Sequence, residues 1–142
     1  MTSSELENLV RVGQLKREPP SETEIVGLQR SGEARLADAE KPGLSLESRF
    51  DLAYNAAHAL SLAALRLLGY RSNNRYVVFQ VLPHTLGVPA PVWRVLAKCH
   101  DLRNVAEYEG AIDLEERLVR DLIEAAQAVH VALRRRDLPR AD

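Results

Sequence analysis

The stretch SRFDLAYNAAHALSLAALRLLG, residues 48–69, decides the fold, because its apolar residues run almost all the way round a helix. One side carries Phe50, Ala53, Ala57, Leu60, Ala64 and Leu68, and the other carries Leu52, Ala56, Ala59 and Ala63. A helix that is apolar on every side is either buried or shared with a partner subunit. Its many alanines allow neighbouring helices to approach closely. The sequence therefore predicts a central helix over about residues 46–68, ended by Gly69.

Helical spacing also accounts for the rest of the chain, and the alternation typical of strands is nearly absent. Two further helices are expected before the central one, over about 3–13 and from Ser21 to the Lys41-Pro42-Gly43 turn. Three are expected after it, over about 74–86, 91–108 and 114–135. Pro83 is expected to kink or end the first of these three, and Asp113 and Glu116 to form a capping pair at the start of the last. The pattern predicts an all-α protein, an antiparallel helical bundle of four to five main helices. Residues 1–44 are expected to form an N-terminal helical extension, and residues 45–142 the bundle.

Composition excludes several classes of function. The chain has 142 residues, which is one domain's worth, and 46% of them are hydrophobic. The net charge of −1 argues against a general binder of nucleic acid or of a membrane surface, although a local basic patch is compatible with it. A single cysteine, Cys99, and an N-terminus without a signal-peptide layout indicate a cytoplasmic protein. The longest apolar stretch is too short to span a bilayer, so no membrane partner is expected.

The stretch HDLRNVAEYEG, residues 100–110, places an arginine on the apolar side of its helix. At about 100° per residue, Arg103 falls within an arc formed by Val92, Val95, Leu96, Cys99, Leu102 and Ala106. A guanidinium there is unfavourable unless it is paired. One explanation is an ion pair with Glu107 along the same helix, with the arginine head leaning outward. The other is that this arc faces a second subunit or a cleft, where a fixed cation binds phosphate.

The central helix offers companions for Arg103. Asp51, Asn55 and His58 share one flank of that helix, and Tyr54 lies nearby. If the two helices pack together, His58 would meet Arg103. The alternative is that His58 is a packed residue bonded to a neighbour.

Other chemistry is hard to find in the sequence. The four histidines have no metal-ligand spacing among themselves or with Cys99, so no metal site is expected. No glycine-rich phosphate loop is present, and no cofactor is expected. Cys99 lies in the apolar arc of its helix, which indicates a core residue and not a nucleophile.

These residues resemble the HEPN domains (higher eukaryotes and prokaryotes nucleotide-binding) over about residues 45–135. The resemblance rests on Arg103-Asn104 late in a long helix, on the Glu107-Tyr108 that follows, and on RFDLAYNAAHAL as the matching earlier helix. It implies a homodimer in which two such motifs share one cleft at the interface, where RNA or a nucleotide binds. It also implies a setting in a toxin–antitoxin, stress or defence module, beside a nucleotidyltransferase or an antitoxin partner.

The chain departs from the family at the catalytic histidine. Active HEPN ribonucleases, which need no metal, carry a His four to six residues after this Arg. The chain has Tyr108, Glu109 and Gly110 there, and a tyrosine with a pKa near 10 is a poor base at neutral pH. His100 lies one turn before Arg103, on the wrong side of the motif.

We therefore expect a non-catalytic or weakly active protein that binds RNA, a nucleotide or a protein partner. The expected binding residues are Tyr54, His58, Arg103, Asn104, Glu107 and Tyr108. One alternative is an active metal-independent ribonuclease that uses Arg103 with Tyr108 or His100. The other is a structural helical adaptor with no ligand, in which Arg103 and Glu107 form an ion pair.

Overall fold

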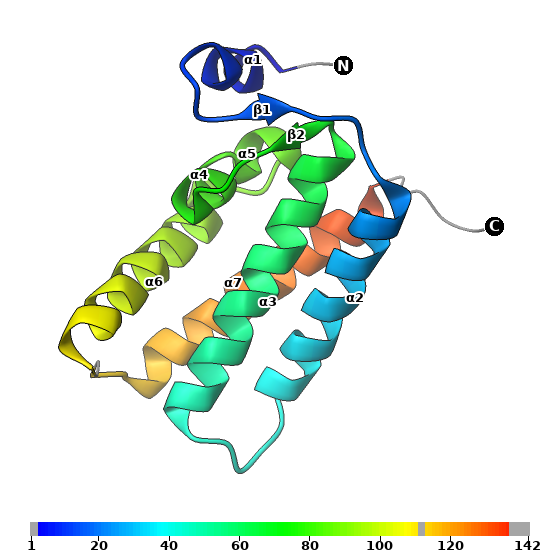
Figure 1. Cartoon of the computed structure of the whole chain (residues 1–142). Helices are drawn as coiled ribbons and strands as arrows, with labels where there is room; N and C mark the ends of the chain where they lie inside the picture. Colours follow the sequence, from blue (N-terminus) through cyan, green and yellow to red (C-terminus); the bar gives the residue numbers. More distant parts are fainter. Residues whose placement is uncertain (1–2, 111–112, 137–142) are drawn as a thin grey trace.

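A bundle of four long helices forms the centre of the protein in this computed structural model, which describes residues 3–110 and 113–136 (Figure 1). The long helices are α2 (Glu22–Ala39), α3 (Leu46–Leu67), α6 (Ala90–Glu109) and α7 (Glu116–Arg135). Shorter elements at one end are α1 (Ser4–Arg11), α4 (Arg75–Gln80), α5 (Leu82–Thr85) and the strands β1 (Lys16–Arg17) and β2 (Tyr70–Arg71). The predicted all-α helical bundle is confirmed.

Helix α3 lies in the middle of this bundle. It runs between α2 on one side and α4 and α6 on the other, and α7 passes behind it (Figure 1). Both of its predicted apolar sides are buried, including Ala53, Ala57 and Leu60 on one and Ala56 and Ala63 on the other. The prediction of a central buried helix is therefore confirmed.

Small residues bring α2 close to α3. A Cβ added at Gly32 of α2 would lie 2.6 Å from the Leu60 Cγ and 3.2 Å from the Ala56 carbonyl oxygen. Helix α2 also places Ile25 and Leu36 in the same core as α3 and α7. The core thus extends across residue 44, where the sequence predicts the start of the bundle.

Several predicted helix ends are confirmed, and others are corrected. The side chains of Ser21, Ser45 and Asn74 cap α2, α3 and α4. The helix expected over 74–86 is instead two short helices that meet at Val81, because Pro83 lacks an N–H and fits only the first turn of a new helix.

The expected capping pair of Asp113 and Glu116 is wrong. Helix α7 begins at Glu116 with Glu115 as its N-cap, and no side chain of the described residues caps it. The antiparallel pair of β1 and β2, with Lys16 opposite Arg71, was not expected either. Two residues are too few to produce an alternating pattern in the sequence.

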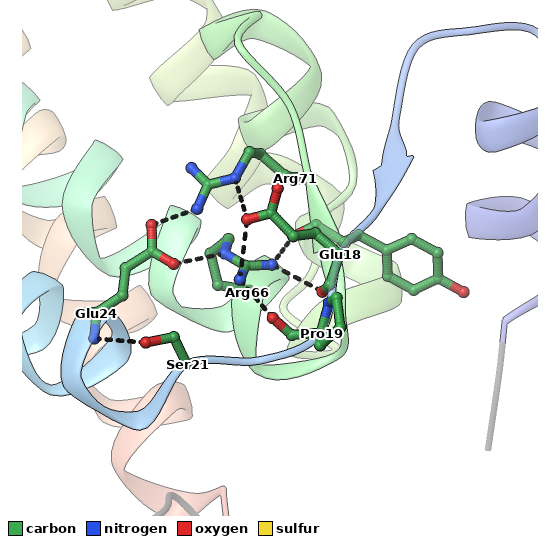
Figure 2. Close-up of polar contacts among 7 residues, drawn as sticks. Glu18, Pro19, Ser21, Glu24, Arg66 and Arg71 are labelled. Atoms are coloured by element: carbon green, nitrogen blue, oxygen red, sulfur yellow. Dashed lines mark hydrogen bonds and ion pairs between the residues drawn. The ribbon is translucent and has the colours of Figure 1, made fainter.

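A buried arginine joins the N-terminal segment to the end of α3 (Figure 2). The side chain of Arg66 is 1% exposed. Its Nε donates to Glu24 Oε1 at 2.8 Å, and its Nη1 donates to the carbonyl oxygens of Glu18 at 3.0 Å and Tyr70 at 3.1 Å. Its Nη2 donates to the Pro19 carbonyl at 2.8 Å and lies 3.3 Å from Glu18 Oε2. The Arg66 guanidinium therefore donates four hydrogen bonds and forms ion pairs with two carboxylates.

A second arginine completes this cluster. Arg71 donates from Nε to Glu18 Oε2 at 2.7 Å and from Nη2 to Glu24 Oε2 at 2.5 Å. Hydrogen bonds from Arg66 and then from Arg71 lower the pKa of the Glu24 carboxyl, so the carboxylate stays charged at neutral pH. The cluster connects Glu18, before α2, and Glu24, in the first turn of α2, to the two arginines on either side of the turn between α3 and β2.

The N-terminal segment also covers a second, smaller core. Leu6 of α1 and Leu15 beside β1 are buried against Val77, Val78 and other residues of α3, β2 and α4. The Tyr70 hydroxyl donates to Glu7 Oε2 at 2.5 Å. Residues 3–20 thus pack against α4 and help to fix its position.

Two glycines in α2 provide a matched test of close packing. Gly32→Ala is expected to lower the free energy of unfolding by about 1–3 kcal/mol, because its methyl group overlaps Leu60 and the Ala56 carbonyl. Gly27→Ala is expected to raise it by about 0.5–1 kcal/mol, since no described heavy atom lies within 4 Å of the added methyl group. Urea unfolding followed by circular dichroism measures both, and equal effects would contradict the packing.

The Arg66 cluster is tested by removing its guanidinium. Arg66→Met is expected to lower the free energy of unfolding by about 3 kcal/mol, because three carbonyls and two carboxylates lose a buried donor. Arg66→Lys is expected to lose less, since the charge remains but the planar fork does not. The exposed Arg30→Met is the control, expected to change stability by at most about 0.5 kcal/mol. A loss no larger than that of the control would show that the cluster contributes little.

Candidate functional site

A polar cluster surrounds Tyr54 where α3, α4 and α6 meet. Tyr54 is fully buried, and its ring packs against Phe50 of the same helix and against Phe79 of α4. Its hydroxyl oxygen lies 2.8 Å from Nδ1 of His100 on α6. Tyr54 thus lies at the bottom of the cluster, and the hydrogen bond between its hydroxyl and His100 connects α3 to α6.

Two arginines lie over this one ring. The Cζ of Arg103 is 5.1 Å from the centroid of the Tyr54 ring, and the Cζ of Arg75 is 5.6 Å from it. Both distances are within the range of cation–π attraction. Because Arg75 comes from α4 and Arg103 from α6, the tertiary fold brings two positive charges to one tyrosine ring.

Both arginines have polar partners. Arg75 Nη1 donates to Asn55 Oδ1 at 3.1 Å. Arg103 lies 3.6 Å from Glu107 Oε1, so the ion pair expected along one helix is present, and it lies 4.0 Å from Asp51 Oδ1. The side chains of both carboxylates are 65% exposed. Such solvent-exposed pairs are weak, so they hold Arg103 in place only loosely.

His58 lies beside this cluster, packed on α4. Its ring packs edge-on against Phe79, with centroids 6.0 Å apart. Burial, and then the charges of Arg75, His100 and Arg103, lower the pKa of His58 to about 4. The imidazole is therefore neutral at neutral pH, and it adds no charge to the two arginines.

His100 makes two polar contacts, one with each of its ring nitrogens. Its Nε2 lies 3.3 Å from Asn104 Nδ2. Its Nδ1 shares a hydrogen bond with the Tyr54 hydroxyl, and the tautomer of the ring decides which of the two donates. Burial raises the pKa of the Tyr54 hydroxyl, an effect that Arg75 partly opposes. The hydroxyl thus keeps its own proton.

A shallow pocket of about 230 Å³ lies beside Arg103. Its lining comprises Glu47, Phe50, Asp51, Arg103, Ala106, Gly110 and Leu114. Arg103 thus has both its ion-pair partners and a pocket beside it.

The structure brings together some of the predicted residues and leaves others at the edge. Tyr54, His100 and Arg103 form the cluster, His58 lies beside it, and Asn104 reaches it through His100. Glu107 lies on the rim as the partner of Arg103. Tyr108 is outside, with 94% of its surface exposed.

Sequence reasoning missed two residues of α4. Arg75 lies over Tyr54, and the ring of Tyr76 has its centroid 6.4 Å from those of His100 and Trp93. The available signal was an arginine directly after the Asn74 cap, at the start of the apolar run YVVF. That position is ordinary for a helix start, so the pattern alone gives no reason to select it.

Cys99 is buried in the core, and burial raises the pKa of its thiol to about 12. It therefore has no appreciable thiolate at neutral pH. Within residues 3–110 and 113–136, no three His, Cys, Asp or Glu side chains are grouped so that they would hold a metal ion.

Comparison of the chain with protein-family models, with curated proteins and with solved structures finds no match. In the described part of the chain, none of the helices is long and apolar enough to cross a lipid bilayer.

The lowered pKa of His58 is measurable by NMR. We expect its imidazole to stay neutral down to about pH 4, because burial, and then the charges of the neighbouring arginines, disfavour protonation. The unfolded chain takes up this proton near pH 6.5 and the folded chain only near pH 4, so this group makes stability fall as the pH drops between those values. The pH titration of the ring resonances measures the pKa, and His58→Gln identifies the signal. An ordinary value near 6.5 would show that the ring is solvated.

Proposed function

We propose that the Tyr54 cluster binds a phosphate group of RNA or of a nucleotide. The observation that supports this most directly is the pair of guanidinium groups, Arg75 and Arg103, over one tyrosine ring. A guanidinium presents a planar fork of donors that matches the oxygens of a phosphate. A phosphate between the two forks would be held from α4 and α6 at once.

The electrostatics of the cluster favour an incoming anion. Asp51 and Glu107 are largely exposed, so a phosphate oxygen can replace them at Arg103 with little loss of free energy. His58 is neutral, so it adds no charge, and Arg75 and Arg103 bring two positive charges to the Tyr54 ring. A bound anion would offset their mutual repulsion.

The resemblance to HEPN domains supplies the setting for this proposal. Arg103 and Asn104, which match the family's motif, lie on the helix that packs against the matching earlier helix, α3. By this analogy alone, the chain would act as a cytoplasmic homodimer in a toxin–antitoxin, stress or defence module. Its partner there would be a nucleotidyltransferase or an antitoxin.

Binding without catalysis suits the residues better than cleavage does. Tyr108 stands where the family has its histidine, and its ring is outside the cluster. His58 has a pKa of about 4, which makes it a weak base. One observation favours the alternative of an active ribonuclease: the His100–Tyr54 hydrogen bond puts an imidazole next to a ring that carries both arginines.

Removal of either arginine tests the proposal. Arg103→Ala and Arg75→Ala are each expected to weaken binding of a fluorescein-labelled ten-nucleotide RNA by about tenfold or more, since a charge-assisted contact is lost. Arg94→Ala is the control, because Arg94 is exposed on the same helix, nine residues or about 180° away from Arg103. Fluorescence anisotropy at low salt measures the affinity. If both variants bind like Arg94→Ala, the site is elsewhere.

The same proteins, assayed for RNA cleavage in EDTA, separate binding from catalysis. We expect no cleavage by the wild type. Cleavage that disappears in Arg103→Ala and in His100→Ala would instead establish the ribonuclease alternative.

A further inference from the structure

The outermost aromatic side chain of α6, Tyr108, packs against little of the described structure. Tyr108 is 94% exposed, whereas Tyr54 and Tyr70 are buried and Tyr76 packs against Trp93. Five large hydrophobic residues of the described chain are notably exposed, and Tyr108 is the only aromatic one among them. A ring in that position contributes almost nothing to the stability of the fold, so it is available to a ligand.

Tyr108 lies at the end of a stripe that starts at the arginine pair. His100, Asn104 and Tyr108 follow one another at four-residue spacing, which places them on one face of α6. The 3.3 Å contact between His100 and Asn104 shows that this stripe is continuous. His100 in turn contacts Tyr54, on which both arginines lie.

The length of this stripe suits a nucleic-acid strand. At about 1.5 Å per residue, Tyr108 lies roughly 8 Å further along the helix axis than Arg103 and roughly 12 Å further than His100. Tyr108 also lies about 140° around the helix from Arg103, and Asn104 lies between the two directions. A strand with a phosphate at the arginines that crosses α6 over Asn104 would bring a neighbouring base to the Tyr108 ring. Val105, one turn earlier and 45% exposed, adds apolar surface next to it.

We propose that Tyr108 is a stacking platform for an unpaired base, so that the site takes single-stranded RNA. This inference rests on the proposed phosphate site. In a duplex the faces of the bases are covered by their neighbours, and only an unpaired base has a free face for the ring. Stacking on an exposed aromatic ring is tolerant of sequence, because every base has such a face. The arginines would hold the backbone, and Tyr108 would select single strands.

The test compares single-stranded and double-stranded probes. Tyr108→Ala is expected to weaken binding of a labelled ten-nucleotide single-stranded RNA by about 5- to 100-fold, in line with the loss of one stacked base. Tyr108→Phe is expected to bind within about twofold of wild type, since the ring remains. Binding of the same RNA as a duplex, and the salt dependence of both, are expected to stay unchanged, because the phosphate contacts remain.

The controls separate this inference from the proposed function. Val131→Ala replaces an exposed apolar residue on α7 and is expected to change neither affinity. If the arginine variants weaken binding but Tyr108→Ala does not, or if Tyr108→Ala weakens single and double strands equally, the stacking role is wrong and the phosphate site stands. If the arginine variants have no effect, the phosphate site itself is wrong. An unchanged affinity with an altered oligomeric state, measured by light scattering, would assign the ring to a protein interface.

Discussion

Burial of α3 over most of its surface is the constraint on which the rest of the structure depends. Its two apolar sides need packing partners, and α2, α4, α6 and α7 supply them. A large polar group buried on such a helix then needs a partner inside the protein. Two large polar side chains of α3 are buried, Tyr54 in its N-terminal half and Arg66 near its C-terminal end. They therefore determine which polar groups pack against each part of the helix.

These two side chains organise different parts of the molecule, and α4 links them. Arg66, with Arg71 and two glutamates, fastens residues 18–24 to the turn after α3. The chain then continues from Arg71 directly into α4, whose first residue, Arg75, lies over Tyr54. The N-terminal segment packs against the other face of α4. The position of Arg75 in the candidate site thus depends on an ion cluster and a small core outside it.

The last turn of α6 lies outside the Tyr54 cluster. Position 108 is exposed there, and a side chain at this position would not reach the Tyr54 ring without a change in the helix or a second subunit. The imidazole that bonds the Tyr54 hydroxyl comes from His100, two turns earlier on the same helix.

The sequence by itself determined most of the helices and their buried faces, because these features depend on residues three and four positions apart. The same spacing put Tyr54 and Arg103 on faces that meet if α3 packs on α6. Only the tertiary structure decided that Arg75 lies over Tyr54, that Arg66 donates to three backbone carbonyls, and that Tyr108 stays in solvent. Those outcomes depend on the angles at which separate helices cross and on the pairing of a two-residue strand. Neither can be predicted from the spacing of residues within one helix.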